Sequence, residues 1–235
     1  MLITLGIIGV VAALTIPTLI SKHEKHIIET GLAKTYSELH NIIRMAEEEH
    51  GSFATWDFTG GTKSFVDKYF APYIQLTPCD TYHTKAKDKC FVTNGAFSTW
   101  YKPTATAKRG EIQSSSSLFY GYLLKDGRAL MFCSEYYADW SVPGYTLTIF
   151  ADVNGKRGRT VMGQDVFAFS INNFRGITNK LKVGPGASRS ENNSSEYLTE
   201  NCIKSIPYVV WQGSACGHLL ERNGWKFPKD YPIKF

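Results

Sequence analysis

The stretch LITLGIIGVVAALTIPTLI, residues 2–20, contains no charged side chain, and threonine is its only polar residue. About 20 apolar residues at a rise of about 1.5 Å each cross a bilayer core of roughly 30 Å. Because only a helix satisfies its own backbone groups in lipid, the stretch predicts a membrane-spanning helix. A cleaved signal peptide is one alternative, but no basic residue precedes Leu2. A buried core helix is the other, but the stretch is apolar on every face.

The rest of the chain has the composition of an ordinary folded protein. Of its 235 residues, 43% are hydrophobic and 20% are charged, which excludes a disordered, collagen-like or heptad-dominated chain. The formal net charge of +5 is mildly basic and does not by itself indicate nucleic-acid binding. The sequence therefore predicts a folded head tethered to a membrane.

The N-terminal helix is expected to continue beyond the apolar stretch. Apolar or small side chains recur at spacings of four and three and form one stripe along a helix: Ile28, Leu32, Thr35, Leu39, Ile42 and Ala46. Together the two parts predict a rod of about 48 residues, roughly 70 Å long. Pro17 lies inside the pattern and predicts a kink or local unwinding near residues 13–17, and Gly31 is a second weak point.

Strand-like segments further along the chain supply a layer that can cover this stripe. Residues 118–124 and 128–133 flank Asp126-Gly127, a dipeptide typical of a type I′ hairpin. Residues 145–151 and 166–171 add two strands rich in β-branched and aromatic side chains. The predicted fold class is α+β, with the long helix packed on an antiparallel β-meander.

Three parts of the chain are expected on this basis. Residues 1–21 form the hydrophobic transmembrane or filament-core helix, residues 22–50 form its amphipathic continuation, and residues 51–235 form the head. Within the head, the sequence predicts a connecting region (51–117) with a short helix near 64–70, the sheet (118–171), and a C-terminal region (172–235) with a short helix at 215–222.

The cysteines indicate an oxidising compartment. Cys79 and Cys90 bracket one short polar loop and Cys202 and Cys216 bracket another, and neither spacing fits a zinc site. Two local disulfides are therefore predicted, each worth roughly 3 kcal/mol in the chain-entropy model. Cys133 lies in an apolar strand-like run and is interpreted as a small buried hydrophobic residue.

Residues 2–17 and the amphipathic helix after them resemble the N-terminal region of type IV pilins and type II secretion pseudopilins. The likeness includes the proline and the small residues of the apolar run, and the order of elements along the chain agrees. It implies a pilin-like fold with a disulfide-stapled C-terminal region, and a structural subunit of a pilus or pseudopilus. It also places Gly6, Gly9, Ala13 and Pro17 at helix-packing positions, for which tolerance of small residues in a membrane helix is the alternative.

The resemblance further implies partners and a location. The partners are other pilin or pseudopilin subunits, the bacterial inner membrane, and a prepilin peptidase that acts on a full-length precursor. Family members follow a basic leader and start with Phe-Thr-Leu-x-Glu, which this sequence lacks, so an upstream leader is expected. Lys22 and Lys25 alone would place the head in the cytoplasm, whereas such a leader would place it in the periplasm, and later at the cell surface.

The segment between the last two predicted strands contains candidate calcium ligands. Asp152, Asn154 and Asp165 supply hard oxygen atoms near glycines, and pseudopilins of the secretion type hold calcium in a loop near the sheet. Three nearby basic residues oppose a cation, and the bidentate glutamate of an EF-hand has no counterpart. A turn whose side chains bond their own backbone is therefore the alternative. No cofactor is expected to be required, and calcium is the one candidate.

The sequence contains no nucleophile elbow, P-loop, zinc-protease motif or dinucleotide fingerprint. A disulfide and a plain helix surface explain Cys216 and His218 better than a nucleophilic pair does. The chain is therefore not expected to be an enzyme, and a membrane-anchored or secreted enzyme is the least favoured alternative. The other alternative is a minor pilin-like protein whose exposed head binds DNA or a surface ligand, which only the excess positive charge supports.

Overall fold

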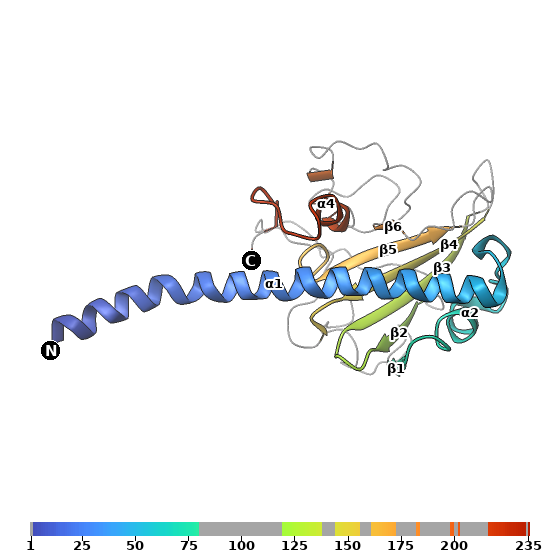
Figure 1. Ribbon diagram of the computed structural model, residues 1–235, viewed down its shortest axis with the longest axis horizontal. Coiled ribbons are helices and arrows are strands. Elements are labelled where there is room, and N and C mark those ends of the chain that lie inside the picture. The colour runs from blue at the N-terminus through green and yellow to red at the C-terminus, as the bar shows by residue number, and fades with distance from the viewer. Residues whose placement is uncertain are drawn as a thin grey trace, which may run out of the picture.

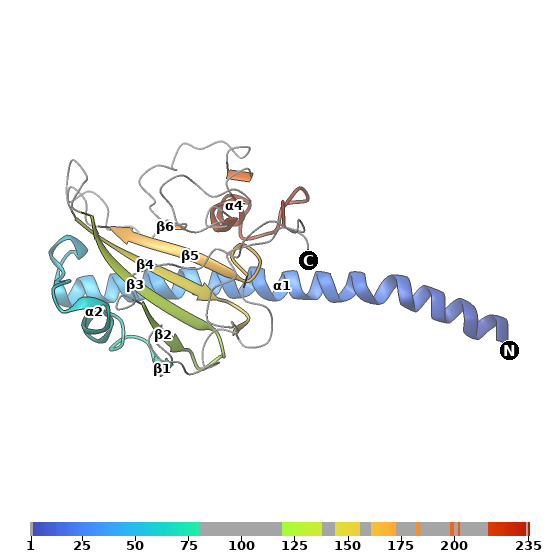
Figure 2. The same cartoon turned by 180° about the vertical axis from the view of Figure 1, so that it is seen from behind.

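A computed structural model describes residues 2–79, 119–137, 144–155, 161–172, 182–183, 198–199, 202, 216–233 and 235. Helix α1 (Leu2–His50) is one continuous element of 49 residues and extends far beyond the head (Figures 1 and 2). The predicted rod is therefore confirmed. The 3₁₀ helix η1 (Phe53–Thr55) and helix α2 (Gly61–Tyr69) follow it, and helix α4 (Cys216–Arg222) lies near the C-terminal end, so both predicted short helices are present.

The strands form one antiparallel sheet whose order follows the sequence. Within the described residues it has six strands: β1 (Thr77–Cys79), β2 (Phe119–Leu123), β3 (Ala129–Tyr137), β4 (Gly144–Asp152), β5 (Val166–Asn172) and β6 (Lys182–Val183). The four central strands confirm the predicted meander. The edge strands β1 and β6 were not predicted, because segments of three and two residues show no periodicity and Pro78 is unusual in a strand.

The turn between β2 and β3 differs from the predicted type I′ hairpin. The Leu124 amide donates to the Arg128 carbonyl over 2.9 Å, which leaves a three-residue loop. Gly127 has a φ of +90°, whereas Asp126 is not among the non-glycine residues with positive φ. A three-residue loop with glycine in the left-handed region gives a bulged hairpin, since a type I′ turn needs positive φ at both central residues.

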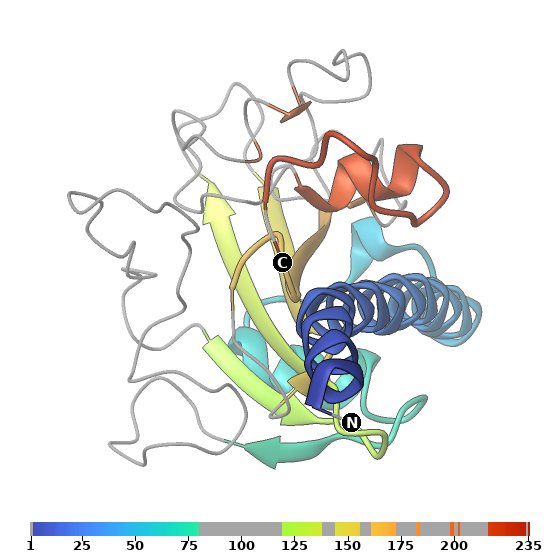
Figure 3. The same cartoon turned by 90° about the vertical axis from the view of Figure 1, so that its left-hand side faces the viewer.

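The second half of α1 packs on one face of the sheet. The predicted stripe Ile28, Leu32, Thr35, Leu39, Ile42 and Ala46 is confirmed, because each of these residues is at most 4% exposed. The apolar residues of the stripe share a core cluster with alternate residues of the strands, namely Leu130, Phe132, Leu147, Ile149, Phe167 and Phe169. Figure 3, which looks along α1, shows the sheet curving around one side of the helix.

Gly31 marks a close approach between α1 and the end of β4. A Cβ atom at this position would lie 3.2 Å from both the Cβ and the carbonyl oxygen of Val153. The predicted weak point therefore lies inside an unbroken helix and lets the two elements approach each other.

The opposite face of the sheet is buried as well. Its residues include Met131, Cys133, Thr148, Phe150, Ala168 and Ser170, each at most 9% exposed. Cys133 is therefore a buried thiol, as predicted. Burial on both faces explains why β3 and β5 have nearly continuous apolar runs in place of a strict alternation.

Helix α1 continues through Pro17 without local unwinding, so that part of the prediction is wrong. Proline has no amide proton for the preceding turn, but neighbouring threonines bond carbonyls of the same turns. Thr15 Oγ1 donates to the Val11 carbonyl over 2.9 Å, and Thr18 Oγ1 donates to the Leu14 carbonyl over 3.5 Å. Figure 1 shows that the part of the helix outside the head curves and has no sharp break.

Candidate functional site

The first half of α1 has a continuous exposed apolar surface. Leu14 is 72% exposed, and the other large aliphatic side chains that are more than half exposed are Ile7, Ile8, Val10, Val11, Ile16, Leu19 and Ile20. By length and composition, α1 is apolar enough to cross a membrane. Soluble monomers rarely expose apolar patches larger than a few hundred Å². This half of the helix is therefore an apolar surface that the described part of the head does not cover.

The four residues predicted at helix-packing positions all lie in this exposed half. Gly6, Gly9, Ala13 and Pro17 are spaced by three, four and four residues, which places them along one face of the helix. A Cβ atom on Gly6 or on Gly9 would meet nothing within 4 Å. No described part of the head packs on this face, so its role in packing against another molecule stays a prediction.

A buried arginine attaches the second half of α1 to the β2–β3 hairpin. The Arg128 side chain is 7% exposed, and its guanidinium donates to Glu38 Oε2 over 2.5 Å, to Thr35 Oγ1 over 2.6 Å and to Asp126 Oδ2 over 2.8 Å. Lys34 Nζ also donates to Asp126 Oδ2, over 2.7 Å. No sequence pattern predicts this network, because Arg128 lies 93 and 90 positions away from Thr35 and Glu38.

The network changes the protonation of Asp126. Partial burial alone would raise the pKa of this carboxyl group, but the hydrogen bonds from Arg128 and Lys34 outweigh that effect. They hold the pKa of Asp126 well below its usual value. Asp126 is therefore ionised at neutral pH, and the hairpin is attached to α1 through charge-assisted bonds.

The C-terminal segment makes a second attachment to α1. Glu29 accepts a hydrogen bond from Lys226 Nζ over 3.0 Å and another from the Phe227 amide over 2.8 Å. One turn nearer the apolar half, Lys25 Nζ lies 5.0 Å from the ring centre of Phe235 and 6.0 Å from that of Phe227. These contacts place the end of the chain beside α1 at the point where the helix leaves the head (Figure 1).

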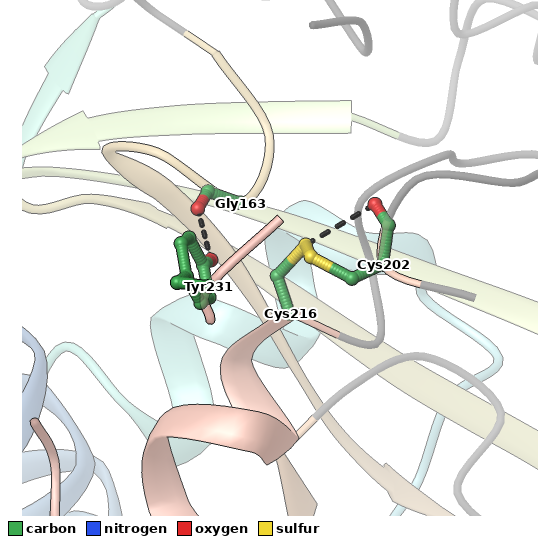
Figure 4. The surroundings of a disulfide bond; sticks show 4 residues. All are labelled: Gly163, Cys202, Cys216 and Tyr231. Carbon is green, nitrogen blue, oxygen red and sulfur yellow. Dashed lines mark hydrogen bonds between the residues drawn. A yellow bond between two sulfur atoms is a disulfide. The ribbon is translucent and has the colours of Figure 1, made fainter. Parts of the chain in front are cut away.

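A disulfide within the C-terminal region lies beside the loop between β4 and β5. Cys202 and Cys216 are bonded, as predicted, and both are buried. Figure 4 shows the bond beside Gly163, whose carbonyl accepts a hydrogen bond from the buried Tyr231 hydroxyl. Burial raises the pKa of Tyr231 well above its usual value, so this phenol stays protonated and continues to donate.

The other predicted disulfide falls partly outside the residues that the structure describes. Cys79 ends strand β1 and is disulfide-bonded. Its predicted partner, Cys90, is not among the described residues. The pairing of Cys79 with Cys90 therefore stays a prediction.

The three candidate calcium ligands lie together in the loop between β4 and β5. Asp152 Oδ1 accepts from the Gly155 amide over 2.8 Å. Asp165 accepts from the Val161 amide over 2.6 Å and from Asn154 Nδ2 over 3.2 Å. These bonds are those of the alternative interpretation, a turn stabilised by its own side chains. Among the described residues, no group of three or more His, Cys, Asp or Glu side chains is placed to hold a metal.

Two amide oxygens of this loop have no hydrogen-bond partner among the described residues. Asn154 Oδ1 and Gln164 Oε1 are buried and accept no hydrogen bond. Calcium is bound by oxygen atoms, including those of side-chain amides, so the donor set fits in kind but not in number. Calcium binding by Asp152, Asn154 and Asp165 therefore stays a prediction.

Calcium binding at this loop would raise the melting temperature of the full chain. A ligand that binds only the folded state stabilises it in proportion to the logarithm of its concentration. The expected result is therefore a calcium-dependent rise that magnesium does not reproduce and that Asn154→Ala removes. An equal melting temperature in calcium and in chelator would leave the turn interpretation.

The structure excludes Cys216 and His218 as a nucleophilic pair. Cys216 is in the disulfide and has no thiol, and His218 Nδ1 lies 3.0 Å from Glu221 Oε2, one turn along α4. The remaining alternatives, a head that binds DNA or a surface ligand and an enzyme of other chemistry, stay predictions.

Comparison with known proteins identifies a family for most of the chain. The model of a family of unknown function, DUF6613, matches residues 18–98 and 97–235. No pilin family is among the matches, and no curated protein or solved structure matches the chain. The matched residues include the amphipathic half of α1, the whole sheet and all five cysteines. The chain therefore belongs to the DUF6613 family.

Proposed function

We propose that this chain is a structural filament subunit of the type IV pilus or type II secretion pseudopilus kind, anchored in a membrane through α1 before assembly. The observation that supports it best is that one unbroken helix has two environments. Its second half is covered by the sheet, and its first half is apolar and exposed. A helix built this way presents the same surface first to lipid and then to the helices of other copies.

The free energy available from covering this surface is large. Burying a Val, Leu or Ile side chain completely is worth about 1.5–3 kcal/mol. Eight such side chains between Ile7 and Ile20 are more than half exposed. Covering them would stabilise the protein by roughly 10 kcal/mol, which is similar to the stability of a whole domain. A freely dissolved monomer is therefore strongly disfavoured.

Lipid and a bundle of helices from other copies exclude water from the apolar half of α1 equally well. The preference for the filament over the membrane therefore has to come from close packing between helices. Small residues allow helix backbones to approach one another in lipid or in a filament core. Gly6, Gly9 and Ala13 lie along one exposed face, and a Cβ atom on either glycine would meet nothing within 4 Å. We assign this face to contacts between subunits.

The disulfides support a location outside the cytoplasm. Bonds of this kind persist in the bacterial periplasm and at cell surfaces, and the Cys202–Cys216 bond is buried within the head. We therefore place the head in the periplasm and the helix in the inner membrane. A prepilin peptidase would process the full-length precursor, and the head would later be displayed on the filament.

Val11→Lys is expected to release the full chain from membranes in cells that express it with its natural upstream sequence. A lysine near the centre of a spanning helix costs about 3 kcal/mol, a factor of roughly 100 in partition. The measurement is the fraction that remains in membranes after carbonate extraction. Ile27→Lys is the matched control, since Ile27 is exposed on the same helix beside the head and its substitution should leave retention unchanged.

A second variant, expressed in the same cells, tests assembly separately from membrane anchoring. Gly9→Leu should leave the subunit in the membrane but remove it from filaments sheared off the cells, because the added side chain keeps neighbouring helices apart. Val10→Leu, one position along, should assemble normally. If the unmodified chain stayed in the membrane but was absent from sheared filaments, the chain would be a membrane-anchored protein and not a filament subunit. Release of the unmodified chain by carbonate would overturn the proposal.

A further inference from the structure

We propose that the end of the head nearest the apolar half of α1 is a contact surface for lipid headgroups. This surface, the interface rim, consists of Lys22, Lys25, Lys226, Phe227, Lys229 and Phe235. This inference rests on the proposed membrane anchoring. It gives the C-terminal segment a second role, which is to hold the head against the bilayer surface before the subunit is assembled.

Two residues of α1, Glu29 and Lys25, contact the C-terminal part of the rim. Glu29 binds both the Lys226 ammonium group and the Phe227 amide, at 3.0 and 2.8 Å. Lys25 lies over the rings of Phe227 and Phe235. Segments about 200 residues apart in the sequence are thus joined on one side of the helix, and Figures 1 and 2 show the C-terminal end beside α1 where it leaves the head.

The depth of the rim follows from the helix rise. Ile20 is the last residue of the apolar stretch, and Lys25 lies five positions later, about 7.5 Å further along the axis. The headgroup layer on each side of a bilayer is roughly 5–7.5 Å thick. With the apolar stretch in the hydrocarbon core, Lys22 lies inside this layer and Lys25, with its two aromatic partners, lies at the outer edge.

The chemistry of the rim suits this depth. Aromatic rings are enriched at membrane interfaces, and long lysine side chains extend toward lipid phosphates. The acidic residues within four positions of a rim residue along the chain are Glu24, Glu29 and Asp230, and Glu29 is already paired with Lys226. Lys22 and Lys229 are exposed and make no ion pair among the described residues, so their ammonium groups are free to bind phosphate.

The test measures how close the rim lies to lipid in the full chain. An environment-sensitive fluorophore is attached to Lys229→Cys, where the exposed thiol reacts and the buried Cys133 does not. The protein is reconstituted into vesicles of equal parts phosphatidylcholine and phosphatidylglycerol. The expected result is a blue shift and a gain in emission relative to the same label at Lys68→Cys, an exposed position on α2 at the far end of the head (Figure 1).

Flotation of the vesicles separates this proposal from the proposed function. If the protein floats with the vesicles but the fluorophore at position 229 shows no more blue shift than the one at position 68, the interface rim is not at the lipid surface. The proposed membrane anchor would then stand. Protein that does not float would overturn both. The paired change Lys22→Gln and Lys25→Gln should reduce the shift at 229, whereas Lys125→Gln, on the β2–β3 turn, should not. A label at Asp230→Cys should reproduce the shift if the first variant does not fold.

Discussion

Arg128→Met lowers the free energy of unfolding by about 3 kcal/mol at neutral pH, which is the expected result of removing the charge that joins α1 to the β2–β3 hairpin. Methionine keeps much of the apolar stem but leaves Glu38, Asp126 and Thr35 without their shared donor. Breaking a fully buried pair costs about 3–5 kcal/mol. Because the two carboxylates are 34% and 35% exposed, the lower end of that range applies. In a thermal melt of the detergent-solubilised full chain, the loss should appear as a decrease of roughly 6–12 °C.

A second arginine on the same helix is the matched control. Arg44 pairs with Glu48 over 2.9 Å, and both side chains are well exposed. A surface pair spaced by four residues contributes about 0.3–0.5 kcal/mol, so Arg44→Met should hardly change the melting temperature. Equal losses in the two variants would show that the Arg128 network does not stabilise the head.

The Arg128 network also predicts how stability changes with acid. The pKa of Asp126 is lower in the folded protein than in the unfolded chain, where it is about 4. The stabilisation is therefore fully present above that unfolded-state value and is lost as the pH falls through the folded-state pKa. The difference in melting temperature between the unmodified chain and Arg128→Met should be constant near neutrality and shrink below about pH 4. A difference that grew in acid would contradict this explanation.

Gly155→Ala is expected to cost roughly 3 kcal/mol or more, because it combines backbone strain with a clash. Gly155 has a φ of +56°, and a Cβ atom there would lie 1.9 Å from the carbonyl oxygen of Gly127. The clashing atom belongs to the backbone of the β2–β3 turn, so no side-chain rotation relieves it. The turn would have to move away from the loop between β4 and β5, and Arg128 would move with it. The measurement is again the melting temperature of the full chain.

Gly61→Ala isolates the part of this cost that comes from the backbone alone. Gly61 has a φ of +76°, but a Cβ atom there would meet nothing within 4 Å. Its substitution should therefore cost only about 1–2 kcal/mol, the penalty for a left-handed conformation. If Gly155→Ala were no worse than Gly61→Ala, the two loops would not be in the close contact that the structure shows.

Features that depend on neighbours along the chain were predictable from the sequence. The spacing of Ile28, Leu32, Leu39 and Ile42 identified the buried face of α1, because a helix has a fixed number of residues per turn. Alternation and turn residues located the four central strands, and the spacing of Cys202 and Cys216 suggested a local disulfide, which is present. Errors arose where local rules compete, as at the bulged hairpin near Gly127 and in the helix that runs unbroken through Pro17.

The sequence by itself therefore determined a long helix with one apolar half and one amphipathic half, and the meander that covers the second half. Only the tertiary structure decided that Arg128 is buried between α1 and the hairpin, that Glu29 holds the C-terminal segment, and that Asp165 bonds Asn154 within its loop. The physical reason is the separation along the chain of the residues that decide each feature. Helical and strand periodicity repeats within a few residues, whereas a polar group's burial and partners depend on segments that meet only after the chain has folded.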